Sequence, residues 1–341
     1  MQKNHLLLAL LATVGATSVM AQSSVTLYGR VNTTIERQKD GDLTTTGMFN
    51  NASRFGFKGV EDLGGGLKAG FVLESGFDSS NAAASGWTHN TGSGLSFARQ
   101  SEVNLSGSFG TVRLGNFISE AYFATADYVS MHNHDTGSSS DALYYDPVWF
   151  GGLSTANKIA YRTPNLGGLT VEGAMSLHER GKDADGNALP EKYGYDLAAN
   201  YNLGALALGA GYSYVNSNYQ VGLRAAYTFG QFTVGGYYQR NKDDNQRVPT
   251  GAGTRNNFRL AGMYTMGASE FHVNLGHANK WSNLADSAAT QWTLGYNYNL
   301  SKRTKVYGYY TRVNNSAGSN INVKQAGDDF SSFAVGVRHN F

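Results

Sequence analysis

The sequence FSSFAVGVRHNF, from Phe330 to Phe341, ends the chain on an aromatic residue and alternates between two kinds of side chain. One parity carries Phe333, Val335, Val337 and His339, and the other carries Ser332, Ala334, Gly336, Arg338 and Asn340. A period of two with unlike sides predicts a β-strand between two different environments. Because a bilayer leaves no backbone group free to go unpaired, a strand that closes a membrane barrel must be ordered to its last residue. The first hypothesis is therefore an outer-membrane β-barrel.

The N-terminus predicts the compartment. Lys3 precedes an apolar stretch at 6–14, and a run of small residues leads to a cleavage site after Ala21. A basic start, a short apolar core and a small residue at the cut are typical of a secretory signal peptide. We therefore expect residues 1–21 to be removed and residues 22–341 to form one barrel domain in the cell outer membrane.

The composition favours the same architecture. Gly (43) and Tyr (21) are abundant, Pro (4) is scarce, and there is no cysteine. Barrels use glycine in tight turns, use tyrosine at the membrane interface, and exclude proline from strands that must donate hydrogen bonds on both sides. Mean hydropathy is −0.36, and no apolar run after the signal peptide reaches the roughly 18 residues of a spanning helix. A net charge of +2 argues against a nucleic-acid partner, which would require a concentrated basic patch.

The two-residue period recurs along the chain and predicts an all-β, transmembrane antiparallel barrel of about 16 strands. Short glycine-rich links alternate with longer polar loops, of which the first is expected at 38–51. In bacterial barrels the short turns are periplasmic and the long loops are external. The predicted strands are 24–37, 52–62, 66–78, 95–107, 111–117, 156–163, 168–179, 191–202, 205–216, 219–229, 231–241, 256–266, 269–281, 289–300, 303–314 and 328–341.

The longest connector, Ile118 to Thr155, is too long for an ordinary loop and predicts a functional element. We expect this third loop to fold into the lumen and narrow it. Rings of charge at a constriction set ion selectivity, so acidic residues facing a basic wall predict a transverse field. The loop acids are Glu120, Asp127, Asp135, Asp141 and Asp146. By strand parity the basic wall consists of Arg30, Arg54, Lys58 and Arg113, with Lys158 higher up. These arginines could alternatively pair with carboxylates and merely stiffen the wall.

Several segments resemble the general porins of β-proteobacteria, the family with Bordetella, Burkholderia, Comamonas and Neisseria members. The matching segments are SVTLYG (24–29), SRFGFKG (53–59) continuing through EDLG (61–64), GSFGTV (107–112), LSKRT (300–304) and VRHNF (337–341). The resemblance implies a 16-stranded homotrimer whose third loop forms the constriction. It also implies diffusive uptake of small hydrophilic solutes, often with anion preference, and places Arg54 where the family has a constriction arginine.

Other chemistries find little support in the sequence. His132 and His134 beside Asp135 form an isolated H-x-H pattern without further clustered ligands, so no metal site is predicted. The stretch Asp183–Asn187 lacks the glycine offset and the closing glutamate of a calcium loop, and an Asx-type turn is the better interpretation. A barrel hydrolase would require converging Ser, His and carboxylate groups, but no G-x-S-x-G motif is present.

The sequence therefore predicts a passive outer-membrane diffusion channel for ions and small hydrophilic solutes, weakly charge-selective through its basic wall and acidic loop. The alternative is a solute-selective channel with a saturable lumen site; a barrel hydrolase ranks below both. No enzymatic activity, cofactor or metal is expected. The expected partners are two further copies of the chain, outer-membrane lipid and lipopolysaccharide, the barrel-assembly machinery through Phe341, and small polar or ionic solutes.

Overall fold

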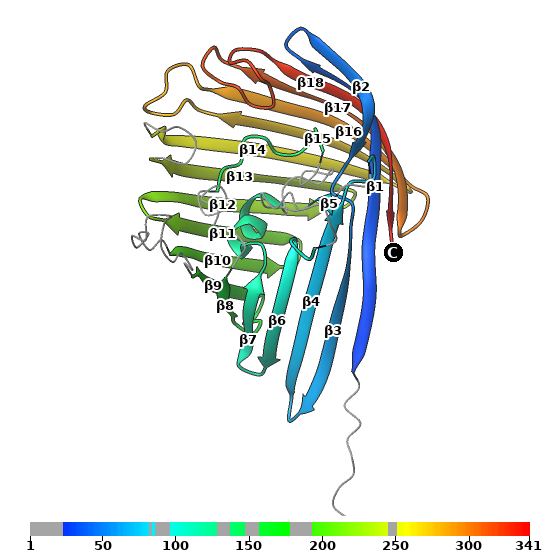
Figure 1. The fold of residues 1–341 in the computed structure, drawn as a ribbon, viewed down its shortest axis with the longest axis vertical. Coiled ribbons are helices and arrows are strands. Elements are labelled where there is room, and N and C mark those ends of the chain that lie inside the picture. Colours follow the sequence, from blue (N-terminus) through cyan, green and yellow to red (C-terminus); the bar gives the residue numbers. More distant parts are fainter. Residues whose placement is uncertain are drawn as a thin grey trace, which may run out of the picture.

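The computed structural model describes residues 23–81, 84–85, 96–127, 137–146, 157–177, 193–244 and 251–341. They form one antiparallel sheet that curls round and closes on itself, and Figure 1 shows its strands from blue to red along the chain. The strands are β1 (Ser24–Asp40), β2 (Leu43–Asn50), β3 (Arg54–Gly64), β4 (Leu67–Phe77), β5 (Ala84–Ser85), β6 (Gln100–Gly107), β7 (Gly110–Asn116), β8 (Lys158–Arg162), β9 (Leu169–Ser176), β10 (Gly194–Leu203), β11 (Leu206–Val215), β12 (Asn218–Phe229), β13 (Phe232–Asp243), β14 (Gly253–Met266), β15 (Ser269–Ala278), β16 (Ala289–Asn299), β17 (Thr304–Asn315) and β18 (Phe330–Asn340). A helical stretch, α2 (Glu120–Tyr122) and η1 (Phe123–Asp127), follows β7.

The barrel closes where its first and last strands meet. β1 pairs antiparallel with β18 from Arg30 opposite Asn340 to Asp40 opposite Phe330. Beyond the ladder, the amide and carbonyl groups of Gly29 and Phe341 exchange two hydrogen bonds of 3.0 Å each. Phe341 is therefore held by the first strand, and the prediction of a closed barrel is confirmed.

The described strands make a 16-stranded barrel, as predicted. β2 and β3 are two halves of one strand, because both pair with β1, and β5 is a two-residue addition beside β4. The interruption at 51–53 includes Ala52, whose φ of 52° is left-handed. This break leads directly into Arg54 at the start of β3.

The predicted loop at 38–51 is wrong. The chain instead continues as a β-hairpin in which β1 and β2 pair out to Asp40 opposite Leu43, turning at Gly41 with a φ of 57°. The segment 43–46 reads Leu-Thr-Thr-Thr, and β-branched residues favour strands even where the surrounding composition is polar. Polarity indicated that this segment leaves the membrane, but it did not indicate the end of the strand pairing.

Alternation of side chains gives the barrel two unlike faces. On β18, Phe333, Val335 and Val337 are 48–58% exposed, whereas Ser332 and Ala334, which have the other parity, are buried. The same parity holds on β12, where Leu223 is 54% exposed and Gln220 is fully buried. A cationic side chain on the lipid side of a barrel costs about 2–4 kcal/mol at the bilayer midplane. The apolar face is therefore the outer one, and the polar face lines the interior.

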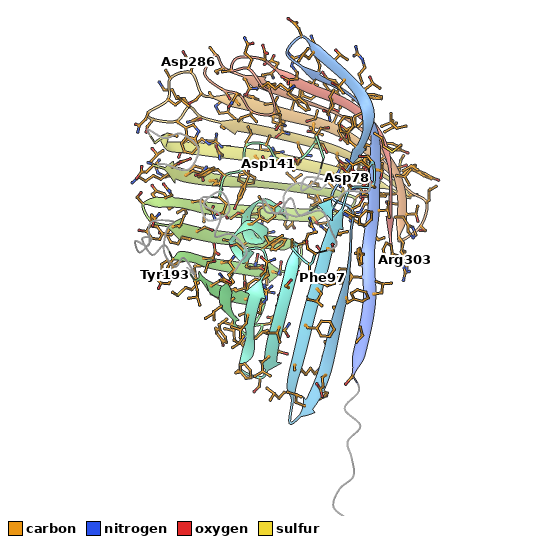
Figure 2. All side chains as sticks on the ribbon, in the orientation of Figure 1. Asp78, Phe97, Asp141, Tyr193, Asp286 and Arg303 are labelled. Atoms are coloured by element: carbon orange, nitrogen blue, oxygen red, sulfur yellow. The ribbon has the colours of Figure 1, made fainter. Side chains whose placement is uncertain are left out.

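Aromatic rings mark the end of the barrel that carries the tight turns. An unbroken series of ring contacts joins β12 to β16, with centroid distances of 4.7–6.3 Å. Arg303 lies at this end (Figure 2), in the turn before β17. Such girdles occur at membrane interfaces, because the rings suit the headgroup boundary. The series consists of Tyr227, Phe229, Phe232, Tyr264, Phe271 and Tyr296.

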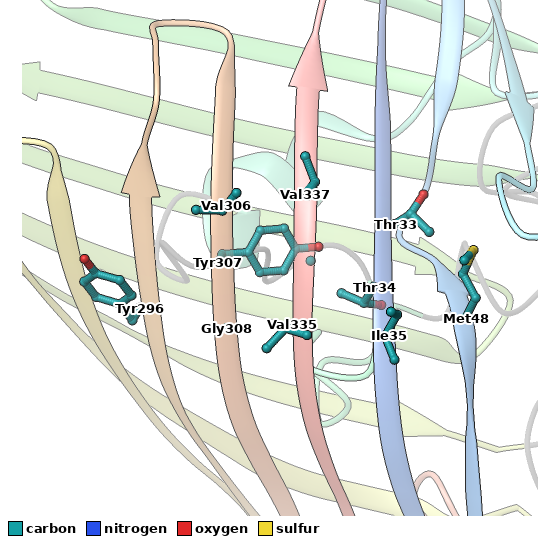
Figure 3. A pocket seen from close by; sticks show the side chains of 11 residues that line it. Thr33, Thr34, Ile35, Met48, Tyr296, Val306, Tyr307, Gly308, Val335 and Val337 are labelled. Carbon is teal, nitrogen blue, oxygen red and sulfur yellow. The ribbon is translucent and has the colours of Figure 1, made fainter.

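The outer face is hollowed at the seam between the first and last strands (Figure 3). A groove of about 680 Å³ lies there, between Met48 on β2 and Tyr296 on β16. It exists because Gly308 contributes no side chain on this face, while Ile35 and Val335 form its apolar lining. Among the described residues, no helix is long and apolar enough to span a bilayer.

Candidate functional site: charges on the inner wall

Three arginines and one glutamate lie close together on the inner wall of β1, β3 and β4 and just before β6; we call Arg30, Arg54, Arg99 and Glu74 the basic cluster. Arg30 and Arg54 stand directly opposite each other on β1 and β3. Glu74 accepts a 2.7 Å hydrogen bond from Nε of Arg99, while Nε of Arg54 lies 3.7 Å away. Directly opposed residues have Cβ atoms about 4.5–5.5 Å apart, and like charges there repel. The cluster therefore concentrates positive charge on this part of the wall.

The position of each cation in the cluster has a local cause. Nε of Arg30 donates to the carbonyl oxygen of Ala52 at 3.1 Å, so the break between β2 and β3 helps hold the guanidinium. Tyr28, two residues before Arg30 on the same face, donates its hydroxyl to Glu74 at 3.0 Å. Lys58 is exposed, and its Nζ lies over the Tyr28 ring, 5.5 Å from the centroid. The structure thus brings together three of the predicted wall residues, Arg30, Arg54 and Lys58.

The row of cations continues across the seam. Lys305 on β17 stands directly opposite Arg338 on β18, and Arg338 is opposite Asn32, two positions from Arg30 on β1. Nε of Arg338 donates to Asn340 at 3.2 Å. Arg99, Lys305 and Arg338 were not among the predicted wall residues. The side chains of Arg338 and Lys305 have the inward parity of their strands, so strand parity could have identified both as wall residues.

The predicted wall residue Arg113 belongs to a different arrangement, which we call the ion-pair network: Glu102, Arg113, Glu172, Arg162 and Glu120. Arg113 donates to Glu102 at 2.8 Å and to Glu172 at 3.0 Å. Nε of Arg162 donates to Glu172 at 2.8 Å, and its Nη2 pairs with Glu120. Anions and cations alternate from β6 to β9, so each arginine contacts two carboxylates and their charges largely cancel.

Glu120 fastens the third connector to the wall. It begins α2, where the Ser119 hydroxyl accepts the Ala121 amide at 3.1 Å. Its carboxylate accepts from Asn200 at 2.9 Å as well as from Arg162. Burial raises the pKa of the Glu120 carboxyl, although Arg162 acts in the opposite direction. Glu120 is therefore a largely buried side chain that fixes the connector to Arg162 and Asn200.

The helical stretch after Glu120 lies against the inner side of β10 to β12. Glycines make this approach possible, because a Cβ at Gly209 would lie 2.0 Å from the Ala124 carbonyl oxygen. Arg224 donates its Nε to the same carbonyl at 2.7 Å. A Cβ at Gly222 would likewise meet the Thr125 side chain at 2.4 Å. The absence of side chains at these two inward positions makes room for the connector.

The second described part of the connector, residues 137–146, runs along the same inner wall. Ser138 donates to Glu36 at 2.6 Å, and Asp141 accepts from Arg259 at 2.7 Å and from the Tyr237 hydroxyl. Figure 2 labels Asp141. Gln239 donates to the Tyr145 carbonyl oxygen at 2.7 Å. The connector is thus bonded to β1, β13 and β14, far from its own ends in sequence.

Four predicted site residues remain. Asp146 is buried and accepts from Ser213 at 3.3 Å. Lys158 is fully buried, its Nζ 3.0 Å from Asp196, so it serves the packing of the wall. Asp127 closes η1, and only its backbone is described. Asp135 lies outside the described residues, as do His132 and His134 of the H-x-H pattern, and the part of the chain that is described holds no metal-binding group of three.

The comparisons with known proteins agree with this architecture. The family model described as Gram-negative porin matches residues 7–318. The chain belongs to the Gram-negative porin family. Outer membrane porin protein 32 of Delftia acidovorans is 32% identical to this porin over the full length of both chains. An outer membrane porin of Bordetella pertussis is 29% identical, also over both full lengths.

Solved structures resemble this porin over nearly its whole length. The anion-selective porin from Comamonas acidovorans superposes with a TM-score of 0.76 at 28% identity, covering 94% of this chain and 100% of that one. OmpF of Salmonella typhi, at 16% identity and a TM-score of 0.67, shares the fold. Family and fold together establish a passive outer-membrane channel and not an enzyme, as the sequence predicted.

Proposed function

We propose that this porin conducts ions and small hydrophilic solutes with a weak preference for anions. The observation that carries the proposal is an asymmetry of pairing. The acids of the connector that have described side chains are bonded to arginines or hydroxyl groups beside them, whereas Arg30 and Arg54 oppose each other across two strands. Paired acids impose little field on a permeating ion, so the basic cluster has the larger effect.

The magnitude of the preference follows from the number of charges. The basic cluster holds three guanidinium groups and one carboxylate, Glu74, which contacts two of the three. Arg54 keeps 23% of its side chain exposed, so water and mobile ions screen it. A partly compensated and partly hydrated cluster favours anions without excluding cations. The Comamonas porin is named for anion selectivity, which agrees in direction.

We also propose that the third connector narrows the lumen. Residues 119–127 and 137–146 bond to inward-facing side chains of β1, β8, β10, β12, β13, β14 and β16, all on the face opposite the lipid. The basic cluster lies on another part of the wall, on β1, β3 and β4 and at Arg99 just before β6. Permeating solutes would pass between these two surfaces.

Reversal potential in a salt gradient tests the selectivity. For the wild-type porin in a planar bilayer we expect a potential of the sign given by anion preference. Arg54→Ala should move it towards cations. Arg37→Ala, which removes an exposed arginine from the outer face of β1, is the matched control and should leave it unchanged. A reversal potential that is the same in Arg54→Ala and the wild type would refute the role of the cluster.

The remaining expectations concern processing and partners. We infer a signal peptide at 1–21, a homotrimer, contacts with outer-membrane lipid and lipopolysaccharide, and recognition of Phe341 by the assembly machinery. Phe341 supports the last, because its side chain is 40% exposed on the outer face while its backbone is fixed to Gly29. Cross-linking of the folded protein in detergent tests the trimer, with monomer alone as the contrary result.

A further inference from the structure

A second groove lies on the outer face, over β12, β13 and β14. It has a volume of about 470 Å³ and is lined by Leu223, Ala225, Tyr238, Phe258 and Leu260. The groove exists because Gly236, at its centre, has no side chain. A Cβ there would lie 2.8 Å from the Arg259 carbonyl oxygen and 2.9 Å from a Leu260 methyl group. The size and apolar lining suit a hydrocarbon chain.

One end of this groove reaches the membrane boundary on the side of the long connectors. Aromatic contacts mark that boundary, with the Tyr238 and Phe258 rings 5.2 Å apart and the Tyr195 and Tyr214 rings 6.4 Å apart. Aromatic side chains collect at headgroup level. A ligand in the groove would therefore place its chain in the bilayer core and its polar end near Tyr238.

A cation occupies that polar end. Arg240 follows Tyr238 by two residues on the same face, about 7 Å further along the strand. It is exposed, its Nη1 donates to Asn256 at 3.2 Å, and among the described residues no carboxylate pairs with it. Lys242 one step beyond is already paired with Asp244 at 2.8 Å. A guanidinium in this position offers charge-assisted hydrogen bonds to a phosphate.

We propose that this groove and Arg240 form a binding site for the lipid A part of lipopolysaccharide, with one acyl chain in the groove and a phosphate on Arg240. Charge complementarity selects the occupant, because an apolar protein surface placed here would bury Arg240 without a counter-charge. The position at the long-connector end selects the outer leaflet, where lipopolysaccharide is the phosphate-bearing lipid. The site deepens the proposed lipid partner and does not depend on ion selectivity.

Native mass spectrometry of the detergent-folded porin, titrated with bisphosphorylated lipid A, tests the site. Removing a charge-assisted hydrogen bond in Arg240→Ala should weaken binding about tenfold or more. Ala225→Phe, which places a larger side chain in the groove, should weaken binding as well, and Arg240→Lys should keep most of the affinity. Planar-bilayer conductance like that of the wild type would show that the variants are folded and that the channel itself is intact.

Two matched variants serve as controls. Lys302→Ala removes one exposed cation from the tight-turn end, and Ala69→Phe enlarges an outward alanine on β4, away from the groove. Both should bind lipid A like the wild type. The proposal is overturned if Arg240→Ala and Ala225→Phe also bind like the wild type. It is equally overturned if phosphatidylglycerol binds the wild type as tightly as lipid A, since the occupant would then be a phospholipid.

Discussion

The basic cluster and the ion-pair network use the same residue types on the same inner wall, yet their charges are paired differently. In the network each arginine contacts two carboxylates, and Glu172 is only 2% exposed. In the basic cluster Arg54 and Arg99 share Glu74, and Arg54 is 23% exposed. We infer that the number of carboxylates around an inward arginine decides its role. Arg113 and Arg162 each contact two carboxylates and belong to the network that holds the connector, whereas we expect Arg54, which shares one carboxylate and is partly exposed, to act on passing ions.

The largest effect is expected where pairing is complete. Glu172→Ala leaves Arg113 and Arg162 without their shared acceptor, and breaking a buried pair costs about 3–5 kcal/mol. We expect a markedly lower midpoint of urea unfolding for the detergent-folded barrel. The control is Glu61→Ala, which removes an exposed acid near a tight turn. Equal midpoints of urea unfolding for the two variants would contradict the proposed difference between the ion-pair network and the basic cluster.

The contact between connector and wall gives the next largest effect. Asp141→Ala removes the acceptor of Arg259 and Tyr237, and hydrogen bonds to charged groups contribute about 1.5–3 kcal/mol each. If the connector narrows the pore, its release should raise single-channel conductance and current noise. Asp286→Ala, in a loop outside that contact, is the control. Unchanged conductance would show that the bond at Asp141 does not set the width of the pore.

For the basic cluster we expect a smaller change in stability than for the ion-pair network, together with a clear change in ion selectivity. Glu74→Gln keeps the size of the side chain and removes a carboxylate that contacts both Arg54 and Arg99. The pair with Arg54 is partly exposed and contributes at most about 1 kcal/mol. The reversal potential should move towards stronger anion preference, opposite in sign to Arg54→Ala. Shifts of the same sign in both variants would contradict the assignment.

The smallest effect is a pH dependence at Glu120. Burial raises the pKa of this carboxyl, so the folded state binds the proton more tightly than the unfolded state does. The resulting stabilisation is complete below the unfolded pKa and is lost as pH rises through the folded pKa. The difference in unfolding midpoint between wild type and Glu120→Gln should therefore change as pH falls from 7 towards 4. A difference that is constant over this range would contradict the raised pKa.

Strand parity alone predicted much of the barrel. The exposure of Phe333, Val335 and Val337, and the inward position of Arg30 and Arg54, follow from a period of two that needs no tertiary information. Register between neighbouring strands is also local, because tight turns fix it. The polar hairpin at 38–51 was missed because polarity indicates exposure to water and does not indicate where strand pairing stops.

The partners of the connector acids could not be predicted in the same way. Asp141 and Arg259 are 118 residues apart, and Glu120 reaches Asn200 across 80. No sequence period relates such positions, since they meet only through the path of the connector inside the closed barrel. Arg224 and Arg259 have inward parity and could have been proposed as wall residues. Their role in holding the connector depends on glycines such as Gly209. The connector backbone occupies the space that a side chain at Gly209 would need.

The two bonds between Gly29 and Phe341 have a consequence for biogenesis. Of the barrel strands, β1 is made first and β18 last, so the ring cannot be completed until β18 has been made and exported. A fragment that lacks β18 would leave two strand edges without neighbours, which invites pairing with other chains. Insertion of β18 therefore closes the wall, and copies that lack this strand differ from finished ones by two unpaired strand edges.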